Sequence, residues 1–472
     1  MHNVGITCKG LCIMMQGLRE NGGKVKEMRQ NSRGGAGKNA VSRRRLCSGP
    51  GLETVMLNIS PKMIKYFVII GFTKAFLPFI LKADTKAEPK GRQNRKGVRG
   101  MSLKFLYLNE PDMIKAGVLD MKKCVQSMDD MFQVMGQGDY LMGSPSENHH
   151  GMMLWFPEER RSEKMPVAGP DRRFMAMPAY VGGRFHVCGN KWYGSNIENQ
   201  KKGLPRSILT VMLNDPDTGA PLALMSANLL SSMRTGAIPG VATKYLQKKG
   251  ASVLGIIGTG VISRSCILAI KETMTDLKEV RAYDLFPEKS AKFAQEMGEQ
   301  IGVKITPVDD MKDAVWGCDV VSVAASGLKP VEIPDEWITP GAVIICTGAA
   351  MFSKEALLKH HVVFDNWQMH KDWLDELRHD PERLLGVNAG HPSAKLLLMV
   401  ARGEVDADHM VSFGDVLAKP EELGRRSDED VFLFLTGGMG TEDAAWGYDV
   451  YQEALKRGIG QELTLWDKPH WA

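Results

Sequence analysis

Apolar runs alternate with amphipathic stretches from about residue 250 onward. Short apolar runs bounded by turn residues are typical of buried strands, and apolar residues repeated every three or four positions are typical of helices. The pattern predicts helices at 261–273, 288–301 and 309–316, and strands at 253–257, 279–283, 304–307, 319–324, 342–346 and 361–364. Such regular alternation predicts a Rossmann-type, doubly wound parallel sheet of the α/β class.

The preceding segment and the C-terminal tail follow a different pattern. Two of their apolar runs flank an Asp-Pro-Asp-Thr-Gly turn, which is a hairpin signature. Pro239 and Gly240 weaken the first turns of one predicted helix. The segment before residue 250 predicts a second domain of the α+β type, with strands at 105–108, 152–156, 174–180, 208–213 and 221–225, and helices at 113–136 and 229–246. The tail predicts a strand within 428–435 and an amphipathic helix at 441–457.

The segment 253–263 combines a strand, a glycine turn and the start of a helix. Gly258 allows the sharp turn, Gly260 lets the backbone approach a pyrophosphate, and Ser263 is small enough for helix and strand to pack. The helix N-terminus offers free N–H groups to phosphates. Asp284 ends the next strand, 26 residues after Gly258, where a carboxylate can accept hydrogen bonds from both ribose hydroxyls. This arrangement favours NAD over NADP, whereas a glycine turn without a ligand is the alternative.

The predicted cofactor contacts extend beyond the glycines themselves. The strand end at 321–326 falls where the nicotinamide side of the cofactor is expected to pass. The residues assigned to cofactor binding on this basis are Gly258, Thr259, Gly260, Val261, Ile262, Asp284, Ala324 and Ser326.

Charge divides the chain into two parts. Residues 1–100 carry 20 Lys and Arg against 5 Asp and Glu, and the remaining residues carry 40 against 50. The body is therefore acidic, and the basic face that nucleic-acid binding requires is not evident. The eight cysteines include no CxxC pair, so no metal motif is indicated. Cys266, Cys318 and Cys346 fall in or near apolar segments, which favours buried thiols in a reducing, cytoplasmic compartment over disulfides.

Residues 1–52 are rich in Gly, Arg, Lys, Asn and Ser, a composition that does not bury a core. We expect the basic leader, residues 1–100, to be a disordered or mis-called extension. Residues 66–81 are strongly apolar, but they are shorter than the about 20 residues that a membrane span needs. Lys74 and Pro78 also interrupt them. We expect Met101 to be the effective start of the folded protein, which leaves open whether residues 1–100 are ever translated. A membrane-anchoring or targeting segment at 66–81 is the alternative.

A second informative block precedes the glycine motif. It consists of Lys191-Trp-Tyr-Gly-Ser-Asn196, Gly203-Leu-Pro205, the hairpin, and Arg234-Thr-Gly-Ala237 at the start of a helix. In order and spacing, this block resembles the ornithine cyclodeaminase/mu-crystallin family over about residues 101–465. That family has a Lys before an Asn-containing loop, then Leu-Pro, an Asp-x-x-Thr-Gly-x-Pro turn, and Arg-Thr-(Ala/Gly)-Ala before the glycine motif.

The resemblance implies catalytic roles for Lys191 and Arg234, which would hold the substrate carboxylate, with Lys191 also transferring a proton. A guanidinium fork is well shaped for a carboxylate. It also implies that Thr235 lies near the cofactor phosphates, and that the protein is a homodimer acting on a small amino or imino acid. Without the resemblance, Lys191 would be interpreted as an exposed loop lysine, and Arg234 as a cation placed unfavourably at a helix N-terminus.

The resemblance divides the chain into three parts. These are the leader at 1–100, a substrate and dimerisation domain formed by 101–240 with about 431–472, and a dinucleotide-binding domain at 241–430. In the last of these the chain departs from the family. An Asp commonly follows the glycine at the strand end near 348, but this chain has Ala349 there. Alanine cannot pair with a substrate amine, although Asp365 or a carboxylate from the substrate domain could replace the Asp.

A second departure concerns the arginine that family members carry ahead of the Met-Pro strand. Four arginines and one histidine are candidates to face the site, and the sequence does not distinguish among them: Arg160, Arg161, Arg172, Arg173 and His150.

The function that these observations favour is NAD(H)-dependent hydride transfer at the α-carbon of an amino or imino acid, as in an imine reductase or an amino-acid or opine-type dehydrogenase. Ala349 favours net redox chemistry over cyclisation. Two alternatives stay open: a redox-neutral ornithine cyclodeaminase that releases ammonia, and a non-catalytic binding protein similar to mu-crystallin.

Overall fold

The computed structural model describes residues 102–169, 171–326, 329–379 and 392–471. The predictions for residues 1–100, including the apolar segment at 66–81, lie outside the described residues. Within the described ranges, no helix is long and apolar enough to cross a membrane.

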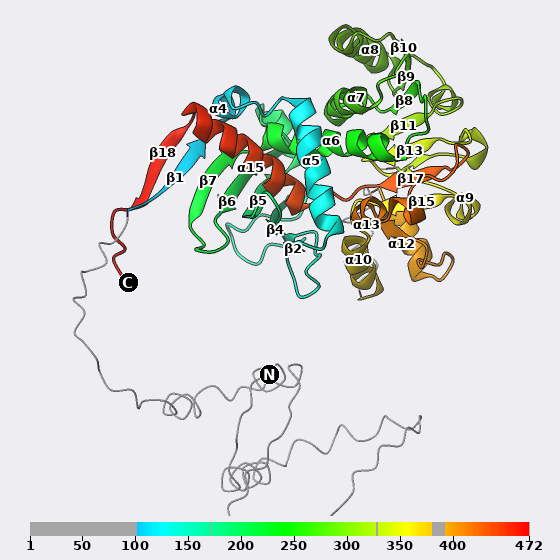
Figure 1. Ribbon diagram of the computed structural model, residues 1–472. Helices are drawn as coiled ribbons and strands as arrows, with labels where there is room; N and C mark the ends of the chain where they lie inside the picture. Colours follow the sequence, from blue (N-terminus) through cyan, green and yellow to red (C-terminus); the bar gives the residue numbers. More distant parts are fainter. Residues whose placement is uncertain (1–101, 170, 327–328, 380–391, 472) are drawn as a thin grey trace, which may run out of the picture. The chain divides into compact units, whose positions relative to one another are not determined.

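The first domain is built on a mixed eight-stranded sheet (Figure 1). Its order is β18-β1-β7-β6-β5-β4-β2, and β3 also pairs with β4. β1 runs parallel to β7, and the other pairs are antiparallel. The strands are β1 (Leu103–Leu108), β2 (Tyr140–Met142), β3 (Met152–Trp155), β4 (Arg173–Val181), β5 (Val187–Ser195), β6 (Ser207–Asn214), β7 (Pro221–Ser226) and β18 (Gln461–Trp466).

Helices cover one face of this sheet, where α5 and α15 lie across the strands (Figure 1). The inward residues of the strands and the apolar face of α5 form a common core that contains Met128, Phe132 and Val211. The helices are α4 (Glu110–Lys115), α5 (Met121–Gly136), α6 (Asn228–Leu246) and α15 (Gly440–Arg457), with a 3₁₀ helix at Ile197–Lys202.

The single helix predicted at 113–136 is wrong, because the chain forms α4 and α5 with a turn between them. Gly117 adopts φ +93°, a left-handed conformation that ends a helix. The Asp120 side chain then accepts a hydrogen bond from the Lys123 N–H at 3.1 Å and caps the start of α5.

The second domain contains the predicted parallel sheet, which confirms the α/β class. The order is β10-β9-β8-β11-β13-β17-β15-β16, and every pair is parallel. The strands are β8 (Val253–Ile257), β9 (Glu279–Tyr283), β10 (Ile305–Pro307), β11 (Val320–Val323), β13 (Val343–Cys346), β15 (His361–Phe364), β16 (Val411–Ser412) and β17 (Phe432–Leu435). A separate ladder joins β12 (Val331–Glu332) to β14 (Ala350–Met351).

Helices connect these strands. They are α7 (Val261–Thr273), α8 (Pro287–Ile301), α9 (Lys354–Lys359), α10 (Trp367–His379), α12 (Ala394–Ala401), α13 (Phe413–Ala418) and α14 (Pro420–Leu423), with 3₁₀ helices at Met311–Ala314 and Asp335–Trp337. The helix predicted at 309–316 is therefore only a short 3₁₀ turn, which Asp310 caps by accepting from the Lys312 N–H at 2.9 Å.

The structure differs from the sequence prediction in the domain that holds β17 and in the role of the glycines of α6. Residues from about 431 were assigned to the substrate domain, but β17 lies between β13 and β15 in the parallel sheet. The return to the first domain therefore begins after β17, with α15.

Gly236 and Gly240 of α6 face α7, where a Cβ at Gly240 would lie 2.7 Å from the Ala269 carbonyl oxygen. These small residues let the two helices pack closely instead of merely weakening α6.

Candidate active site

The glycine turn after β8 lies at the carboxyl ends of three neighbouring strands. Gly258 has φ +83°, and a Cβ there would lie 2.8 Å from the Cα of Ala325, which follows β11. Gly348, after β13, is equally close, because a Cβ there would lie 2.5 Å from the Ala325 carbonyl oxygen. This edge of an open parallel sheet is where dinucleotides bind. The described backbone therefore forms a close-packed cradle there that larger residues would fill.

The N-terminus of α7 is open to a ligand. Gly260 is its N-cap, and no side chain accepts a hydrogen bond from the first turn. Val261 is 70% exposed, so the first turn faces outward. The Ser263 hydroxyl donates to the Gly258 carbonyl at 2.5 Å and fixes the turn from within. Free N–H groups at the start of a helix of this length suit the pyrophosphate of a dinucleotide.

Asp284 is tied to the same turn. Its Oδ2 accepts hydrogen bonds from the Thr259 N–H at 2.8 Å and from the Thr259 hydroxyl at 2.9 Å. Its Oδ1 accepts from the Phe286 N–H at 3.1 Å. The carboxylate therefore stands beside the glycine turn in a fixed orientation, as a group that binds a ribose would need to.

Replacing Asp284 by Ser is expected to lower the ratio of kcat/KM with NAD to that with NADP by about tenfold or more, because the lost contact is a charge-assisted hydrogen bond and the lost charge repels a 2′-phosphate. Initial rates with the two cofactors measure this ratio. An unchanged ratio would show that Asp284 does not select the cofactor.

The other residues predicted to bind the cofactor lie near the ends of β8 and β11 and on α6 and α7. The Ala324 N–H bonds to the Ile257 carbonyl at 2.9 Å, which brings the end of β11 beside the end of β8. Ser326 is exposed just beyond, and Ile262 is half-buried in α7. Thr235 lies in α6, one residue before the close approach of Gly236 to α7, and its hydroxyl donates to the Ser231 carbonyl at 2.7 Å.

Lys191 lies within β5 and not in a loop, so the exposed-loop interpretation is wrong. It points to the helix-covered face of the sheet, and only 4% of it is exposed. Its Nζ lies 2.7 Å from Oδ2 of Asp443, in the first turn of α15. The Nζ also lies 5.7 Å from the centre of the Tyr193 ring.

Arg234 lies in the second turn of α6, which begins at Asn228, so the argument from a cation at the helix N-terminus does not apply. It is 5% exposed, and its Nε donates to Oδ1 of Asp443 at 3.2 Å. Its Nη1 forms an ion pair with Oε2 of Glu442, and its Nη2 donates to the Ser231 hydroxyl at 3.3 Å. Lys191 and Arg234, predicted to act together, therefore meet through the carboxylates of α15.

These four groups form a buried cluster of two cations and two carboxylates. Burial, reinforced by the charge of Arg234, lowers the pKa of Lys191 to about 8. Burial also raises the pKa of Glu442 to about 7, although the charge of Arg234 opposes this change. Both groups can therefore change protonation state near neutral pH. Oε1 of Glu442 is buried and accepts no hydrogen bond among the described residues.

Asp365 holds the glycine turn that lies against Arg234. It is fully buried after β15, and its Oδ2 accepts from the N–H groups of Gly437 and Gly438, the latter at 2.9 Å. Burial alone would raise the pKa of Asp365, but the His370 hydrogen bond and these N–H groups lower it below the usual value. Gly438 lies against Arg234, since a Cβ at Gly438 would be 3.0 Å from its Nη1. Asp365 therefore fixes the turn behind Arg234.

The four arginines and the histidine that the sequence left as candidates lie in different surroundings. Arg173 is the first residue of β4, and its guanidinium carbon lies 5.8 Å from the centre of the Tyr193 ring, which Lys191 also approaches. Arg160 and Arg172 bond to backbone carbonyls of their own loop, and Arg161 is exposed. His150 packs its ring on Trp373 of α10 at 4.8 Å between centroids.

Glu442 and Asp443 were missed by the sequence prediction, which treated 441–457 only as an amphipathic closing helix. The available signal was an adjacent acidic pair directly after a glycine turn, but acids in a first turn commonly serve the helix dipole alone.

Ala349 is buried, as an apolar residue there should be, and its carbonyl accepts a hydrogen bond from the Val331 N–H at 2.9 Å. Among the described residues, no group of acidic, His and Cys side chains could hold a metal ion.

The sequence profile of the ornithine cyclodeaminase/mu-crystallin family matches residues 118–458. The chain belongs to this family. N-((2S)-2-amino-2-carboxyethyl)-L-glutamate dehydrogenase of Staphylococcus aureus is 28% identical to it over 376 residues, which cover 78% of this chain and 100% of that protein. The prediction made from the Lys191–Arg234 block is therefore confirmed at the level of the family.

Two solved structures of family relatives share this fold. Delta(1)-pyrroline-2-carboxylate reductase of Thermococcus litoralis, in complex with NADH and L-proline, has 27% sequence identity and a TM-score of 0.60 over 76% of this chain and 99% of its own. An archaeal alanine dehydrogenase dimer with bound NAD has 26% identity and a TM-score of 0.63 over 77% of this chain and 100% of its own.

Proposed function

We propose that the protein is an NAD(H)-dependent oxidoreductase that transfers hydride at the α-carbon of an amino or imino acid. The observation that carries this function is the buried cluster of Lys191 and Arg234 with Glu442 and Asp443, joined by α6 to the glycine cradle. The predicted enzyme class and the NAD cofactor are confirmed by relatives that bind NAD or NADH and act on such substrates.

The nicotinamide supplies or accepts the hydride, and the protein supplies the charges and the proton. Arg234 and Lys191 present cationic groups to the substrate carboxylate. A neutral Lys191 amine can remove the proton that the substrate nitrogen loses on oxidation, and the ammonium form can return it on reduction. Glu442 or Asp443 can pair with the substrate ammonium, which replaces the Asp that family members carry at the position of Ala349.

The pH dependence should differ between the two directions. Because the pKa of Lys191 is lowered to about 8, amine oxidation should become faster as pH rises through about 8, since the neutral amine is the base. Imine reduction should become slower over the same range, since the ammonium is the acid. Profiles of kcat/KM for both directions measure this. Profiles with the same slope in both directions would contradict the role of Lys191.

One assay distinguishes this function from its alternatives. The purified full chain is mixed with NAD or NADH and a panel of amino acids, cyclic imines, and α-keto acids with amines, while nicotinamide absorbance and ammonia are followed together. A change in NADH with at least one substrate supports the proposal. Ammonia without net change in NADH would instead indicate a cyclodeaminase, and no change in either would favour a binding protein.

We also propose that the protein is a homodimer through the outer face of the first sheet. Register places six large apolar side chains on that face, away from the helices, and each is more than a third exposed. The rings of Phe174 and Trp192 stack there at 5.6 Å. A contiguous apolar patch of this kind is typical of an interface. The patch consists of Met152, Leu154, Phe174, Trp192, Ile208 and Met212. Sedimentation of the protein at the monomer mass would refute the dimer.

A cytoplasmic location is proposed from the thiols. The described cysteines are all free, and the three predicted to be buried are buried: Cys266, Cys318 and Cys346. Burial raises the pKa of each of these thiols, so they are inert toward disulfide formation. Free thiols are typical of a reducing compartment. Cell fractionation that recovers the protein from an oxidising compartment would overturn this location.

A further inference from the structure

Arg173 lies on the same face of the first sheet as Lys191, and close to it. Side chains alternate along a strand, so Lys191, Tyr193 and Ser195 of β5 share the helix-covered face. Arg173 lies opposite Ser195 in the ladder and therefore shares this face. The Nζ of Lys191 lies 5.7 Å from the centre of the Tyr193 ring, and the guanidinium carbon of Arg173 lies 5.8 Å from it. The two cations are therefore separated by no more than the sum of these distances.

This end of the face is open, whereas the start of β5 is covered. A Cβ at Gly189 would lie 2.7 Å from the Cβ of Ala444 in α15, so helix and strand are in close contact there. Tyr193 and Arg173 are only half-buried, and 22% of the Arg173 side chain is exposed. A ligand that extends from Lys191 along this face can therefore reach the guanidinium.

Arg173 is held by its neighbours, yet most of its hydrogen-bond donors are unused. Its guanidinium carbon also lies 5.6 Å from the centre of the Trp155 ring, so it contacts two aromatic rings. An arginine has five N–H donors. Within the described ranges, only its Nη1 has a carboxylate partner, which is Asp171. The Nε and Nη2 groups are therefore available to a ligand.

The charges around Asp171 do not balance. Its Oδ2 accepts hydrogen bonds from Nε of Arg206 and from the Ser195 hydroxyl, the latter at 2.5 Å. Its Oδ1 pairs with Nη1 of Arg173. In the described part of the chain, no other carboxylate pairs with either arginine. Two guanidiniums therefore share one carboxylate.

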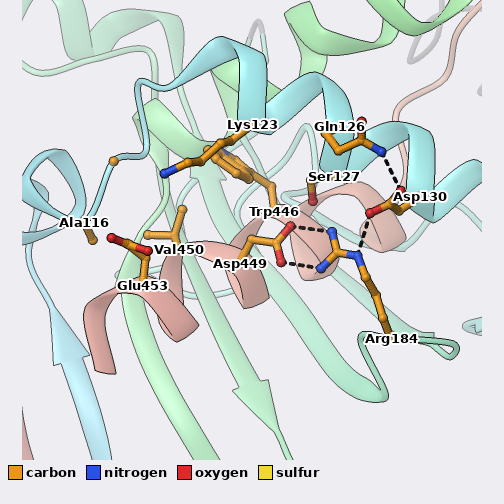
Figure 2. Close-up of a pocket in the computed structure, with 11 residues that line it drawn as sticks. Ala116, Lys123, Gln126, Ser127, Asp130, Arg184, Trp446, Asp449, Val450 and Glu453 are labelled. Atoms are coloured by element: carbon orange, nitrogen blue, oxygen red, sulfur yellow. Dashed lines mark hydrogen bonds and ion pairs between the residues drawn. The ribbon is translucent and has the colours of Figure 1, made fainter. Parts of the chain in front are cut away.

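Arg184, in the same domain, shows the opposite arrangement (Figure 2). It binds both oxygens of Asp449, at 2.6 and 2.8 Å, and its Nε donates to Asp130 at 2.6 Å. One guanidinium between two carboxylates has its charge fully balanced. The two guanidiniums that share Asp171 instead leave one positive charge unbalanced, at the open end of the face that carries Lys191.

We propose that Arg173 binds a second acidic group on the substrate, which makes it a specificity-determining residue for amino or imino acids with two carboxylates. The inference rests on the proposed function, in which Lys191 and Arg234 hold the α-carboxylate. The carboxylate at the other end of the substrate would accept hydrogen bonds from Nε and Nη2 of Arg173, a geometry for which a guanidinium fork is well shaped. The Tyr193 ring would lie beside the carbon chain between the two carboxylates.

The separation of the two cations sets the length of this substrate. Consecutive carbon atoms lie about 1.5 Å apart, and a charge-assisted N–H···O contact adds about 2.8 Å at each end. A chain of five carbons with a carboxylate at each end, as in glutamate, is therefore long enough to bridge Lys191 and Arg173 even at their largest possible separation.

The test measures binding of L-glutamate and L-norvaline to the full chain saturated with NADH, by calorimetric titration. The two amino acids have the same five-carbon chain, but norvaline ends in a methyl group instead of the second carboxylate. NADH cannot accept a hydride from either amino acid, so the titration reports binding and not turnover. We expect L-glutamate to bind at least about tenfold more tightly, the effect of one charge-assisted hydrogen bond.

Variants of Arg173 locate the source of this preference. Arg173→Gln should bring the ratio of the two affinities to about one by weakening L-glutamate, and Arg173→Lys should keep part of the preference because it keeps the charge. Arg206 still pairs with Asp171 in both variants, so this carboxylate keeps a cation and the protein should fold. Arg161→Gln is the matched control, since Arg161 is exposed in the loop before β4, and it should leave the ratio unchanged.

Lys191→Gln separates this inference from the proposed function on which it rests. It should weaken both amino acids alike, because both carry the α-carboxylate. If Lys191→Gln weakened neither, the proposed site itself would be wrong. The role of Arg173 alone is overturned if L-glutamate does not bind or binds no more tightly than L-norvaline. It is also overturned if Arg173→Gln weakens both amino acids equally, since Arg173 would then hold the α-carboxylate.

Discussion

Replacing Lys191 by Gln is expected to lower kcat/KM by about 10²–10⁴-fold, the usual contribution of a positioned proton-transfer group. Gln retains an N–H donor for Asp443, which lies 2.7 Å from the lysine nitrogen, but it can neither carry the charge nor exchange a proton. Part of the loss should appear in KM, because we propose that the side chain also faces the substrate carboxylate. Steady-state kinetics in both directions, with the substrate identified by the panel assay, measures the effect.

The matched control is Lys202→Gln, which changes the same residue type at an exposed position of the 3₁₀ helix after β5. It should leave kcat/KM within twofold or so of the wild type, as surface changes usually do. If Lys191→Gln retained full activity in a folded protein, Lys191 would have no catalytic role, and the binding-protein alternative would gain support.

Local signals predicted the strand, turn and helix that open the second domain well, because nearby residues specify each of them. The apolar run at β8, the glycines at 258 and 260 and the helical pattern of α7 agree with one another, and the observed bounds of all three match. β17 could not be placed in the same way. Its apolar sequence fits a strand in either domain, and only its pairing with β13 and β15 decides the matter.

The buried cluster of two cations and two carboxylates shows the same limit more sharply. Lys191 and Arg234 were found through the family block, but Asp443 is 252 residues from Lys191 along the chain. Nothing near Asp443 in the sequence distinguishes it from an acid that serves a helix dipole. Lys191 and Asp443 pair because Lys191 lies on the face of the sheet that α15 covers. The chain brings α15 back to this sheet only near its C-terminus, and the residues around Asp443 give no sign of that contact.

Replacing Arg234 by Met should have the largest effect on stability. Arg234 is the shared partner of Glu442 and Asp443, all three almost fully buried, so its loss leaves Lys191 alone with two buried carboxylates. Removing one member of a buried ion pair costs about 3–5 kcal/mol. Urea unfolding at neutral pH measures this loss. Activity should fall with it, because the guanidinium that we propose holds the substrate carboxylate is gone.

The size of this loss should depend on pH in a direction that can be derived. Burial raises the pKa of Glu442 above its ordinary value of 4.5, while Arg234 opposes the rise, so Arg234→Met raises it further. An acid with a raised pKa in the folded state holds a proton that the unfolded chain has lost, so stability falls as pH rises from about 4.5 through the folded pKa. The deficit of Arg234→Met relative to the wild type should therefore be smallest near pH 5 and grow toward pH 8.

The double variant Arg234→Met, Glu442→Gln isolates the cause of this pH dependence. Gln keeps the shape of Glu442 but has no charge to bury, so the double variant should regain much of the lost stability at pH 8 and little at pH 5. A deficit that is equal at both pH values, or a double variant no more stable than Arg234→Met at pH 8, would show that Arg234 acts through packing. In that case the charge of Arg234 would not offset the charges of Glu442 and Asp443. The proposed contact of Arg234 with a substrate carboxylate would then need separate evidence.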